Sequence, residues 1–221
     1  MINNFLNLQE AAIDLRYLLN RKYNRKSALD FVGNKWNLNR DARHILYRAI
    51  FSDEEIDARH QTELKITEIK EKLISIDTYN IIITIESLLQ GLLVIKADDG
   101  YFRDISKVFS KYKQSQYTLN AIQMIIKKLK SFQPKKLLFF LDKDISKSGE
   151  LAALIKKELD KFEVMGDAKT VQSSDTSVIT FGEIVISNDR VVLEKAKKHM
   201  NLISLLLVDL KNSGINLLEI K

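Results

Sequence analysis

The amino-acid sequence predicts an α/β protein in which a basic helical module precedes a three-layer α/β domain with a mainly parallel sheet. Within the first fifty residues, apolar side chains recur three or four positions apart, as in amphipathic helices. From residue 80 onward, short segments that are apolar throughout alternate with amphipathic ones, which is typical of buried parallel strands joined by helices. With 45% hydrophobic residues, seven glycines and one proline among 221 residues, the chain does not belong to the disordered or collagen-like classes.

Three short helices are predicted between residues 1 and 50. Asn24 and Asn39 are suitable N-caps for the second and the third, and the third covers residues 37–51. The apolar face of the first helix consists of Phe5, Leu8, Ala12, Leu15 and Leu19, and that of the third of Ala42, Ile45, Leu46 and Ala49.

A charged segment follows this module. Ser52 and Glu55 have the spacing of a capping box, and Ile56, Leu64, Ile69, Leu73 and Ile76 continue a helical apolar pattern. The sequence therefore predicts a long helix through residue 76, and we expect a helical basic module at 1–50, a bridging helix at 51–76 and an α/β domain at 77–221.

Strands and helices are expected to alternate in the α/β domain. Helices are predicted at 119–129, from Ser148 to about 159, and at 190–199. Strands are predicted at 80–86, 92–100, 136–141, around 168–172, at 182–187 and at 202–209. Such βαβ units form parallel sheets with right-handed crossovers.

Basic residues are concentrated at the N-terminus. Residues 1–50 contain nine basic and four acidic side chains, so most of the net charge of +6 lies there. A basic module beside a near-neutral one indicates a nucleic-acid partner, although a solvated basic surface gives the same pattern. Tyr23 and Trp36 are candidates for stacking on unpaired bases, with a core role as the alternative for Trp36. The candidate phosphate contacts are Arg21, Lys22, Arg25, Lys26, Lys35, Arg40 and Arg43.

The residue types and motifs that are missing from the sequence exclude several classes of function. The chain has no cysteine, which excludes disulfides, thiolate metal sites and cysteine nucleophiles. Its three histidines are scattered, and neither a P-loop nor a dinucleotide-binding glycine motif is present. The N-terminal segment is amphipathic rather than a signal peptide, and no apolar run approaches the ~20 residues of a membrane span. We expect a soluble cytoplasmic protein with no membrane partner; the sequence does not indicate its oligomeric state.

Acidic residues follow several of the predicted strands. Glu86 follows the segment 80–85, Asp142 follows 136–141, and Asp189 follows 182–187, while Asp175 lies in a loop after a shorter strand. Ligand sites of parallel sheets lie at the carboxyl ends of the strands. Each acid alone fits a turn or a helix cap, but three that converge need a cation between them, and oxygen-only ligands favour Mg²⁺ or Mn²⁺. The expected metal ligands are Glu86, Asp142 and Asp189.

The chain as a whole resembles an uncharacterised, largely archaeal family known as a domain of unknown function. The segments that carry this resemblance are "DLRYLLNRKYNRKSALDFVGNKW", "LYRAIFS", "ADDGYFRDIS" and "SKSGELAAL". Members of that family pair a helical N-terminal module with a C-terminal α/β module, which is the organisation expected here.

Residues 80–209 are similar to PIN-like nucleases of the NYN and YacP-like branch. "TIES" resembles the first acidic motif, with Glu86 where an Asp is usual and Ser87 where an Asn is common, and "LFFLD" and "ISNDRVVL" resemble the later ones. This resemblance implies a metal-dependent endoribonuclease that hydrolyses phosphodiesters, in RNA rather than DNA. Its site would consist of Glu86, Asp142, Asp175 and Asp189.

Two alternatives remain open at this stage. "FFLDKDISKSGELAALI" is also similar to the Toprim motif of Mg²⁺-dependent nucleic-acid enzymes, in which Glu86, Asp142 and Asp144 would hold the metal. A nucleic-acid-binding adaptor without catalytic activity is the other alternative.

Overall fold

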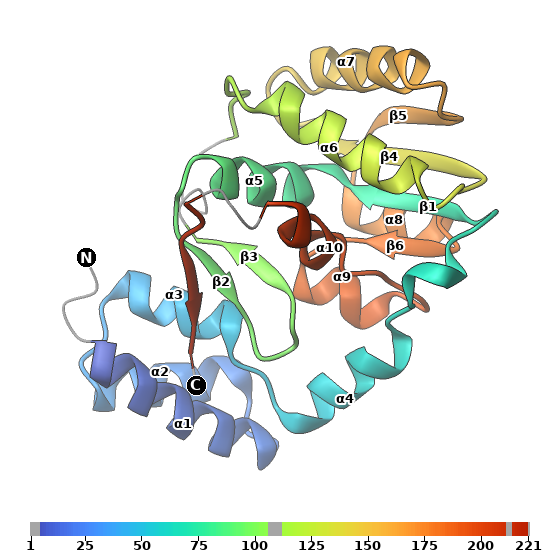
Figure 1. Cartoon of the computed structure of the whole chain (residues 1–221). Coiled ribbons are helices and arrows are strands. Elements are labelled where there is room, and N and C mark those ends of the chain that lie inside the picture. The colour runs from blue at the N-terminus through green and yellow to red at the C-terminus, as the bar shows by residue number, and fades with distance from the viewer. Residues whose placement is uncertain (1–4, 106–111, 211–213, 221) are drawn as a thin grey trace.

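The computed structural model describes residues 5–105, 112–210 and 214–220 of the chain. It is a mixed α/β structure in which an N-terminal group of helices lies beside a parallel sheet covered by helices (Figure 1). No helix in these described ranges is long and apolar enough to cross a membrane.

The three predicted N-terminal helices are present. They are α1 (Phe5–Asn20), α2 (Arg25–Lys35) and α3 (Arg40–Ala49). The side chain of Asn24 accepts hydrogen bonds from the N–H groups of Lys26 and Ser27 at the start of α2, and Asn39 caps α3 in the same way. Both caps were predicted from the sequence, and they satisfy N–H groups that have no partner within the helix.

The bridging helix was predicted too long. Helix α4 (Asp53–Thr62) opens with the predicted capping box but ends at Thr62, and a single 3-10 turn (Ile66–Glu68) follows. Residues Leu73–Asp77 then form strand β1. The apolar residues 69–76 had been assigned to the helix because of their spacing, but the last of them pair with strands on both sides, which outweighs a local pattern.

Four parallel strands form the main sheet. Besides β1 they are β4 (Lys136–Asp142), β5 (Gly166–Val171) and β6 (Ile184–Ile186), in the order β5-β4-β1-β6. The strands predicted at 136–141, 168–172 and 182–187 are therefore confirmed, and so is the expectation of parallel pairing.

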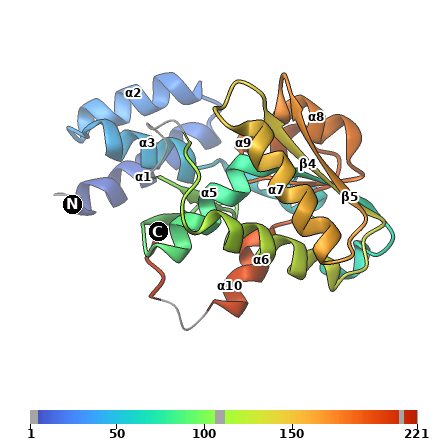
Figure 2. The same ribbon diagram turned by 90° about the horizontal axis from the view of Figure 1, so that it is seen from above.

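Helices cover both faces of this sheet (Figure 2). On one face lie α5 (Thr78–Leu89), α6 (Thr118–Lys130) and α7 (Ser148–Lys161), and on the other lie α8 (Ser174–Phe181) and α9 (Arg190–Lys195). Side chains alternate along β1: Ile74 and Ile76 belong to the core under α5–α7, whereas the hydroxyl of Ser75 donates to the carbonyl of Val178 in α8. Asp77, two residues beyond Ser75, therefore faces the α8 side.

Two strand predictions were wrong. Residues 80–86 lie within helix α5, and residues 202–209 form helix α10 (Leu202–Asp209), capped by Asn201. Helix α5 is buried on nearly all sides, because the sheet, α6, α10 and strand β3 (Phe102–Asp104) surround it. A helix in such a position carries no polar stripe, so its sequence is indistinguishable from that of a buried strand.

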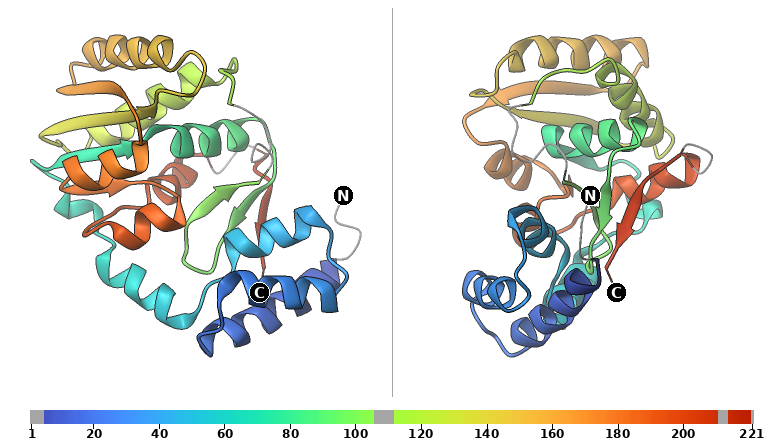
Figure 3. Two further views of the ribbon diagram at one scale, coloured as in Figure 1. Left: turned by 180° about the vertical axis from the view of Figure 1, so that it is seen from behind. Right: turned by 90° about the vertical axis from the view of Figure 1, so that its left-hand side faces the viewer.

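A second sheet joins the two parts of the molecule. Strand β2 (Val94–Lys96) pairs antiparallel with β3 (Phe102–Asp104) and parallel with β7 (Leu217–Glu219). The core of the N-terminal helices extends onto this sheet through Ile95, Ala97 and Ile220 (Figure 3). Of these three strands only β2 had been predicted, within the segment 92–100, and the Asp-Asp-Gly turn expected at the end of that segment follows it.

Candidate functional site

The strand order places a candidate ligand-binding edge between β1 and β6. The chain runs from β1 to β4 and β5 on one side, and then returns to β6 on the other side of β1. In open parallel sheets, ligands bind outside the carboxyl ends of the strands at such a reversal of strand order. Here the residues that leave the sheet side by side are Asp77, after the pair Ile76–Ile186, and Ser187.

Asp77 is the last residue of β1 and is 1% exposed. Its Oδ2 accepts hydrogen bonds from the hydroxyl of Ser187 at 2.7 Å and from the side-chain amide of Asn80 at 2.6 Å. Both donors point at the same oxygen and fix the plane of the carboxylate.

Asp189 follows on the other side of Ser187. Its backbone N–H donates to the Ser187 hydroxyl at 3.0 Å, and its Oδ1 accepts from the N–H groups of Val191 and Val192 at the start of α9. Ser187 is thus held between the two acids, as donor to Asp77 and as acceptor from Asp189.

Asp142 and Asp175 approach the same edge from the neighbouring strand and from α8. Asp77 pairs with Phe140, so Asp142 lies two residues farther along β4 on the same face, about 8 Å from Asp77 between Cα atoms by strand geometry. Both oxygens of Asp142 are bonded to Ser174, one to its N–H and one to its hydroxyl, each at 2.8 Å. Asp175 is the next residue of α8 and is exposed.

The charges of these acids influence one another. Burial raises the pKa of Asp77 from 3.8 to about 7, and the negative charges of Asp175 and Asp189 add to the shift against the two hydrogen bonds. Partial desolvation, Asp189 and Asp142 raise the pKa of Asp175 as well. Asp77 and Asp175 are thus close enough to neighbouring acids for their charges to interact, and Asp77, Asp142, Asp175 and Asp189 are together called the carboxyl edge below.

Glu86 does not belong to this edge. It lies in α5 rather than after a strand, nine residues from Asp77, which is about 13 Å along a helix and on the opposite face of the sheet. It is fully buried, and the hydroxyls of Thr118 and Tyr112 donate to its Oε1. The expected position of Glu86 at a strand end was wrong because the strand itself was.

Asp77 is the site residue that the sequence analysis missed. It was assigned to the junction of the bridging helix and the α/β domain, three residues before the segment 80–86 that was assigned to the first strand. A usable signal was present: "LISID" is a short apolar run that ends in an acid, as "LLFFLD" is at Asp142. Asn80, three residues on, was missed for the same reason.

The carboxyl edge suits a divalent cation by the chemistry of its oxygen ligands, but it is not a preformed chelate. Within the described residues, no three Asp, Glu, His or Cys side chains are close enough to hold a metal ion together. The carboxylates of Asp77, Asp142 and Asp189 hydrogen-bond to Ser187, Ser174 and the α9 N-terminus instead. To share one ion with Asp77, the side chains of Asp142 and Asp189 would have to rotate away from Ser174 and the α9 N-terminus. Asp144, the alternative to Asp189, is exposed beyond the end of β4.

Several of the predicted phosphate contacts bind within the protein. Arg25 donates to both oxygens of Glu55 and to the carbonyl of Ile50, and Arg43 donates to the carbonyls of Leu38 and Asp30 and to Asn34. Lys22 pairs with Glu54, and Lys35 with Asp14. Arg21, Lys26 and Arg40 are exposed.

The aromatic candidates also differ from one another. Trp36 donates its indole N–H to Asp14 at 2.7 Å and packs against the core of the helical module. Tyr23 is 58% exposed and is the better placed of the two to meet a ligand.

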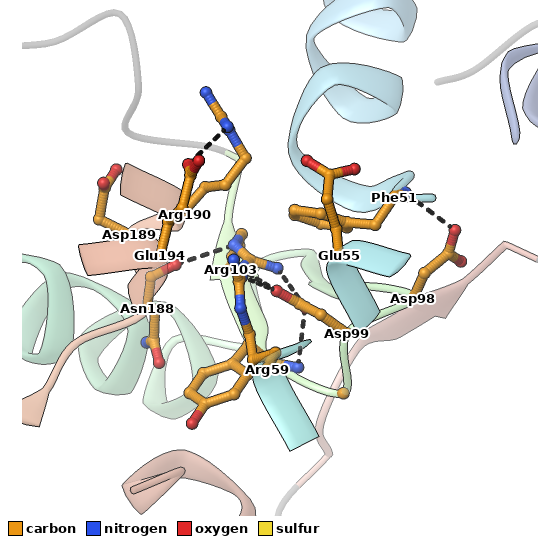
Figure 4. A network of polar contacts seen from close by, with 12 residues as sticks. Phe51, Glu55, Arg59, Asp98, Asp99, Arg103, Asn188, Asp189, Arg190 and Glu194 are labelled. Carbon is orange, nitrogen blue, oxygen red and sulfur yellow. Dashed lines mark hydrogen bonds and ion pairs between the residues drawn. The ribbon is translucent and has the colours of Figure 1, made fainter. Parts of the chain in front are cut away.

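A buried ionic cluster connects the helical module to the exit of β6 (Figure 4). Asp99, in the turn between β2 and β3, accepts two hydrogen bonds from Arg103 at 2.6 and 2.7 Å and a third from Arg59 of α4. Although burial alone would raise it, these guanidinium charges hold the pKa of Asp99 below its usual value. The Nε of Arg103 donates to the carbonyl of Asn188 at 2.8 Å, next to Asp189.

The ring of Phe51 completes this cluster. The guanidinium groups of Arg25, Arg59 and Arg103 lie 5.0, 5.3 and 5.0 Å from its centre. Arg59 comes from α4 and Arg103 from β3, so the end of the helical module is fixed relative to the carboxyl edge of the main sheet.

Comparisons with known proteins match nearly the whole chain. A family described as "Domain of unknown function (DUF5616)" matches residues 66–205, and one described as "Protein of unknown function (DUF434)" matches residues 7–61. The protein described as "Uncharacterized protein MJ0935", from Methanocaldococcus jannaschii, is 32% identical over 189 residues, which cover 86% of this chain and 90% of that protein. No solved structure matches the chain significantly. The chain therefore belongs to the DUF5616 family, and its N-terminal helical module matches DUF434.

Proposed function

We propose that the protein is a PIN-like, Mg²⁺- or Mn²⁺-dependent nuclease that hydrolyses phosphodiesters, with single-stranded RNA as its favoured substrate. The observation that carries this proposal is Asp77, a buried carboxylate with a raised pKa at the reversal of strand order, beside Asp142, Asp175 and Asp189. Perturbed carboxylates grouped at such an edge are typical of functional sites.

Asp77 takes the place that the PIN-like resemblance gave to Glu86. Asp77 ends the first strand of the main sheet, and Asn80 follows shortly after it, which is the Asp and Asn arrangement usual in that branch. Asp142 ends the second strand and Asp189 follows the fourth. These correspondences support the proposal. With Asp77 and Asn80 the motif has its usual residue types, whereas Glu86 and Ser87 departed from both.

In this mechanism Asp77, Asp142 and Asp189 hold the cation, and Asp175 assists. A cation held by these residues would supply activation of a water nucleophile and charge neutralisation at the scissile phosphate. Ser187 and Asn80, by donating to one oxygen of Asp77, orient the carboxylate for the metal, as outer-shell partners of ligands do. The proton on Asp77 has to leave before the cation binds, so binding strengthens as the pH rises through about 7.

The helical module would bind the nucleic acid. Exposed Arg21, Lys26 and Arg40 supply positive charge, and the exposed ring of Tyr23 is available to stack on an unpaired base. Arg25 and Arg43 are left out of this surface because their donors are used within the protein.

A binding adaptor without catalysis is the second candidate. It is favoured by the carboxylates' hydrogen bonds to protein groups and by the lack of a ready chelate in the described residues. The two candidates differ in whether a divalent cation produces cleavage.

The test is a cleavage assay on labelled single-stranded RNA with Mg²⁺ or Mn²⁺. We expect Asp77→Asn and Asp189→Asn to lose metal-dependent cleavage and Asp144→Asn, which changes an exposed acid of the same type, to retain it. Loss with Asp144→Asn and retention with Asp189→Asn would favour the Toprim-like alternative. If the protein binds RNA but cleaves it with none of the divalent metals, the nuclease proposal fails and the binding adaptor is favoured.

A further inference from the structure

The end of helix α3 lies against the second sheet and is linked to the exit of β6 through Arg103. The carbonyl of Ala49 accepts a hydrogen bond from the N–H of Asp98 at 2.8 Å, and the ring of Phe51 lies under the guanidinium of Arg103. Arg103 in turn bonds to the carbonyl of Asn188, which precedes Asp189 (Figure 4). Arg48 lies one residue before Ala49, and its guanidinium is close enough to Asp189 for the two charges to interact.

Arg48 is surrounded by charged side chains of both signs. It is half-buried, and the nearby charges are those of Arg103, Asp104 and Asp189. Desolvation and the like charge of Arg103 lower the pKa of Arg48, and the two carboxylates offset this only in part. Its ionised form is therefore less well stabilised here than in water.

No group in the described part of the chain bonds to this guanidinium. The other half-buried or buried arginines all have bonded partners among the described residues. Arg16 pairs with Asp98, Arg25 with Glu55, Arg59 and Arg103 with Asp99, and Arg190 with Glu194, while Arg43 bonds to backbone carbonyls. Desolvating five N–H donors without partners costs free energy, which a bound ligand would recover.

The carboxylates nearest to Arg48 are already engaged. Asp104 accepts from the hydroxyl of Ser87 at 2.7 Å, and Asp189 caps α9. An anion that enters between Arg48 and the carboxyl edge would satisfy the guanidinium and, with a cation at the acids, would balance their charge. Phosphate fits best, because its oxygens match the paired donors of an arginine.

We propose that Arg48 binds a backbone phosphate of the RNA beside the acidic edge, so that the N-terminal module supplies a substrate-positioning residue to the site on the α/β domain. This inference rests on the proposed function for the identity of the ligand. It assigns to the DUF434 segment a direct contact near the reacting phosphate, in addition to general electrostatic attraction.

Binding without chemistry tests this inference. The full chain is titrated into a short fluorescein-labelled oligouridylate in EDTA, and fluorescence anisotropy is followed at several salt concentrations. We expect Arg48→Gln to weaken binding by about tenfold or more and to reduce the salt slope by about one. Arg48→Lys keeps the charge but not the paired donors, so its RNA affinity should lie between those of the wild type and Arg48→Gln. Lys157→Gln, which removes the same charge from the exposed surface of α7, should bind as the wild type does.

Thermal unfolding separates binding from a structural role. Because Arg48 has no bonded partner among the described residues, Arg48→Gln should unfold at the same temperature as the wild type or higher. A lower temperature, unchanged RNA binding by Arg48→Gln, or absence of RNA binding by the wild type would each overturn the inference. RNA binding that depends on Arg48 without any metal-dependent cleavage would instead leave the inference standing and overturn the nuclease.

Discussion

The hydroxyl of Ser187 donates a hydrogen bond of 2.7 Å to the carboxylate of Asp77 and thereby joins the carboxyl ends of β1 and β6. The two strands are neighbours in the sheet but lie more than a hundred residues apart in the sequence. The same hydroxyl accepts the N–H of Asp189, so one side chain sets the relative positions of two acids of the proposed site.

Asp77→Asn should change how stability depends on pH. Between pH 3.8 and about 7 the folded protein keeps a proton on Asp77 that the unfolded chain has lost. The wild-type free energy of unfolding therefore carries a contribution that is complete below pH 3.8 and falls by about 4 kcal/mol as the pH rises to 7. Asn has no proton to lose, so the free energy of unfolding of the variant should rise relative to that of the wild type between pH 3.8 and about 7.

Urea unfolding from pH 4 to 8 measures this difference. Asp144→Asn is the matched control, because it removes an exposed acid from the next strand end. A constant difference between Asp77→Asn and the wild type across the whole range would contradict the raised pKa of Asp77.

His199 should produce the opposite dependence. It is fully buried between the hydroxyls of Tyr101 and Thr62, at 2.6 and 2.9 Å, and burial, aided by the charge of Arg59, lowers its pKa from 6.5 to about 4. Below pH 6.5 the unfolded chain binds a proton at His199, whereas the folded protein stays neutral there until about pH 4. The free energy of unfolding therefore falls by about 3 kcal/mol as the pH falls from 6.5 to 4.

His199→Gln should therefore show a weaker loss of stability between pH 6.5 and 4 than the wild type does. His60→Gln, which changes an exposed histidine of α4, serves as the control and should keep the wild-type slope. In the wild type the contributions of His199 and Asp77 oppose each other, so only the single variants reveal them. Equal slopes for His199→Gln and wild type would rule out a buried neutral imidazole.

Asp99→Asn should destabilise the protein strongly. It leaves the guanidinium groups of Arg59 and Arg103 buried together without a counter-charge, and losing one member of a buried ionic cluster costs about 3–5 kcal/mol. Glu150→Gln, which breaks the exposed pair with Lys147, should cost less than about 1 kcal/mol. Comparable free energies of unfolding for the two variants, measured in urea at pH 7, would show that the cluster does not hold the two parts together.

Local sequence signals predicted the elements that have capped ends or one polar face. Asn24, Asn39 and the Ser52–Glu55 capping box lie where helices begin, and the amphipathic helices around residues 119–129 and 151–159 are present. The strand "LLFFL" is also present, because its length and its Pro134 boundary distinguish it from a helix.

The elements buried on all sides could not be assigned in this way. Residues 80–86 and 202–209 are mostly apolar without a clear polar face, and their packing against the sheet and α6 decides that they are helices. Because residues 80–86 were assigned to the first strand in place of residues 73–77, Glu86 rather than Asp77 was expected as the acid at the end of that strand. Asp142 ends strand β4, and Asp175 and Asp189 follow β5 and β6; these strands were predicted in the right places, and the role of the three acids in a common site stays a prediction. The cluster of Asp99 with Arg59 and Arg103 leaves no sequence signal, because it joins three separate segments.

Titration calorimetry with Mn²⁺ at pH 8 tests the central claim most directly, because it detects the proposed cation at the carboxyl edge without requiring a substrate. The account predicts that the wild type and Asp144→Asn bind Mn²⁺ alike, and that Asp77→Asn and Asp189→Asn bind it at least about tenfold more weakly, as expected when a ligand or its orientation is lost. Equal Mn²⁺ affinity of Asp77→Asn and wild type, or no binding by the wild type, would contradict it.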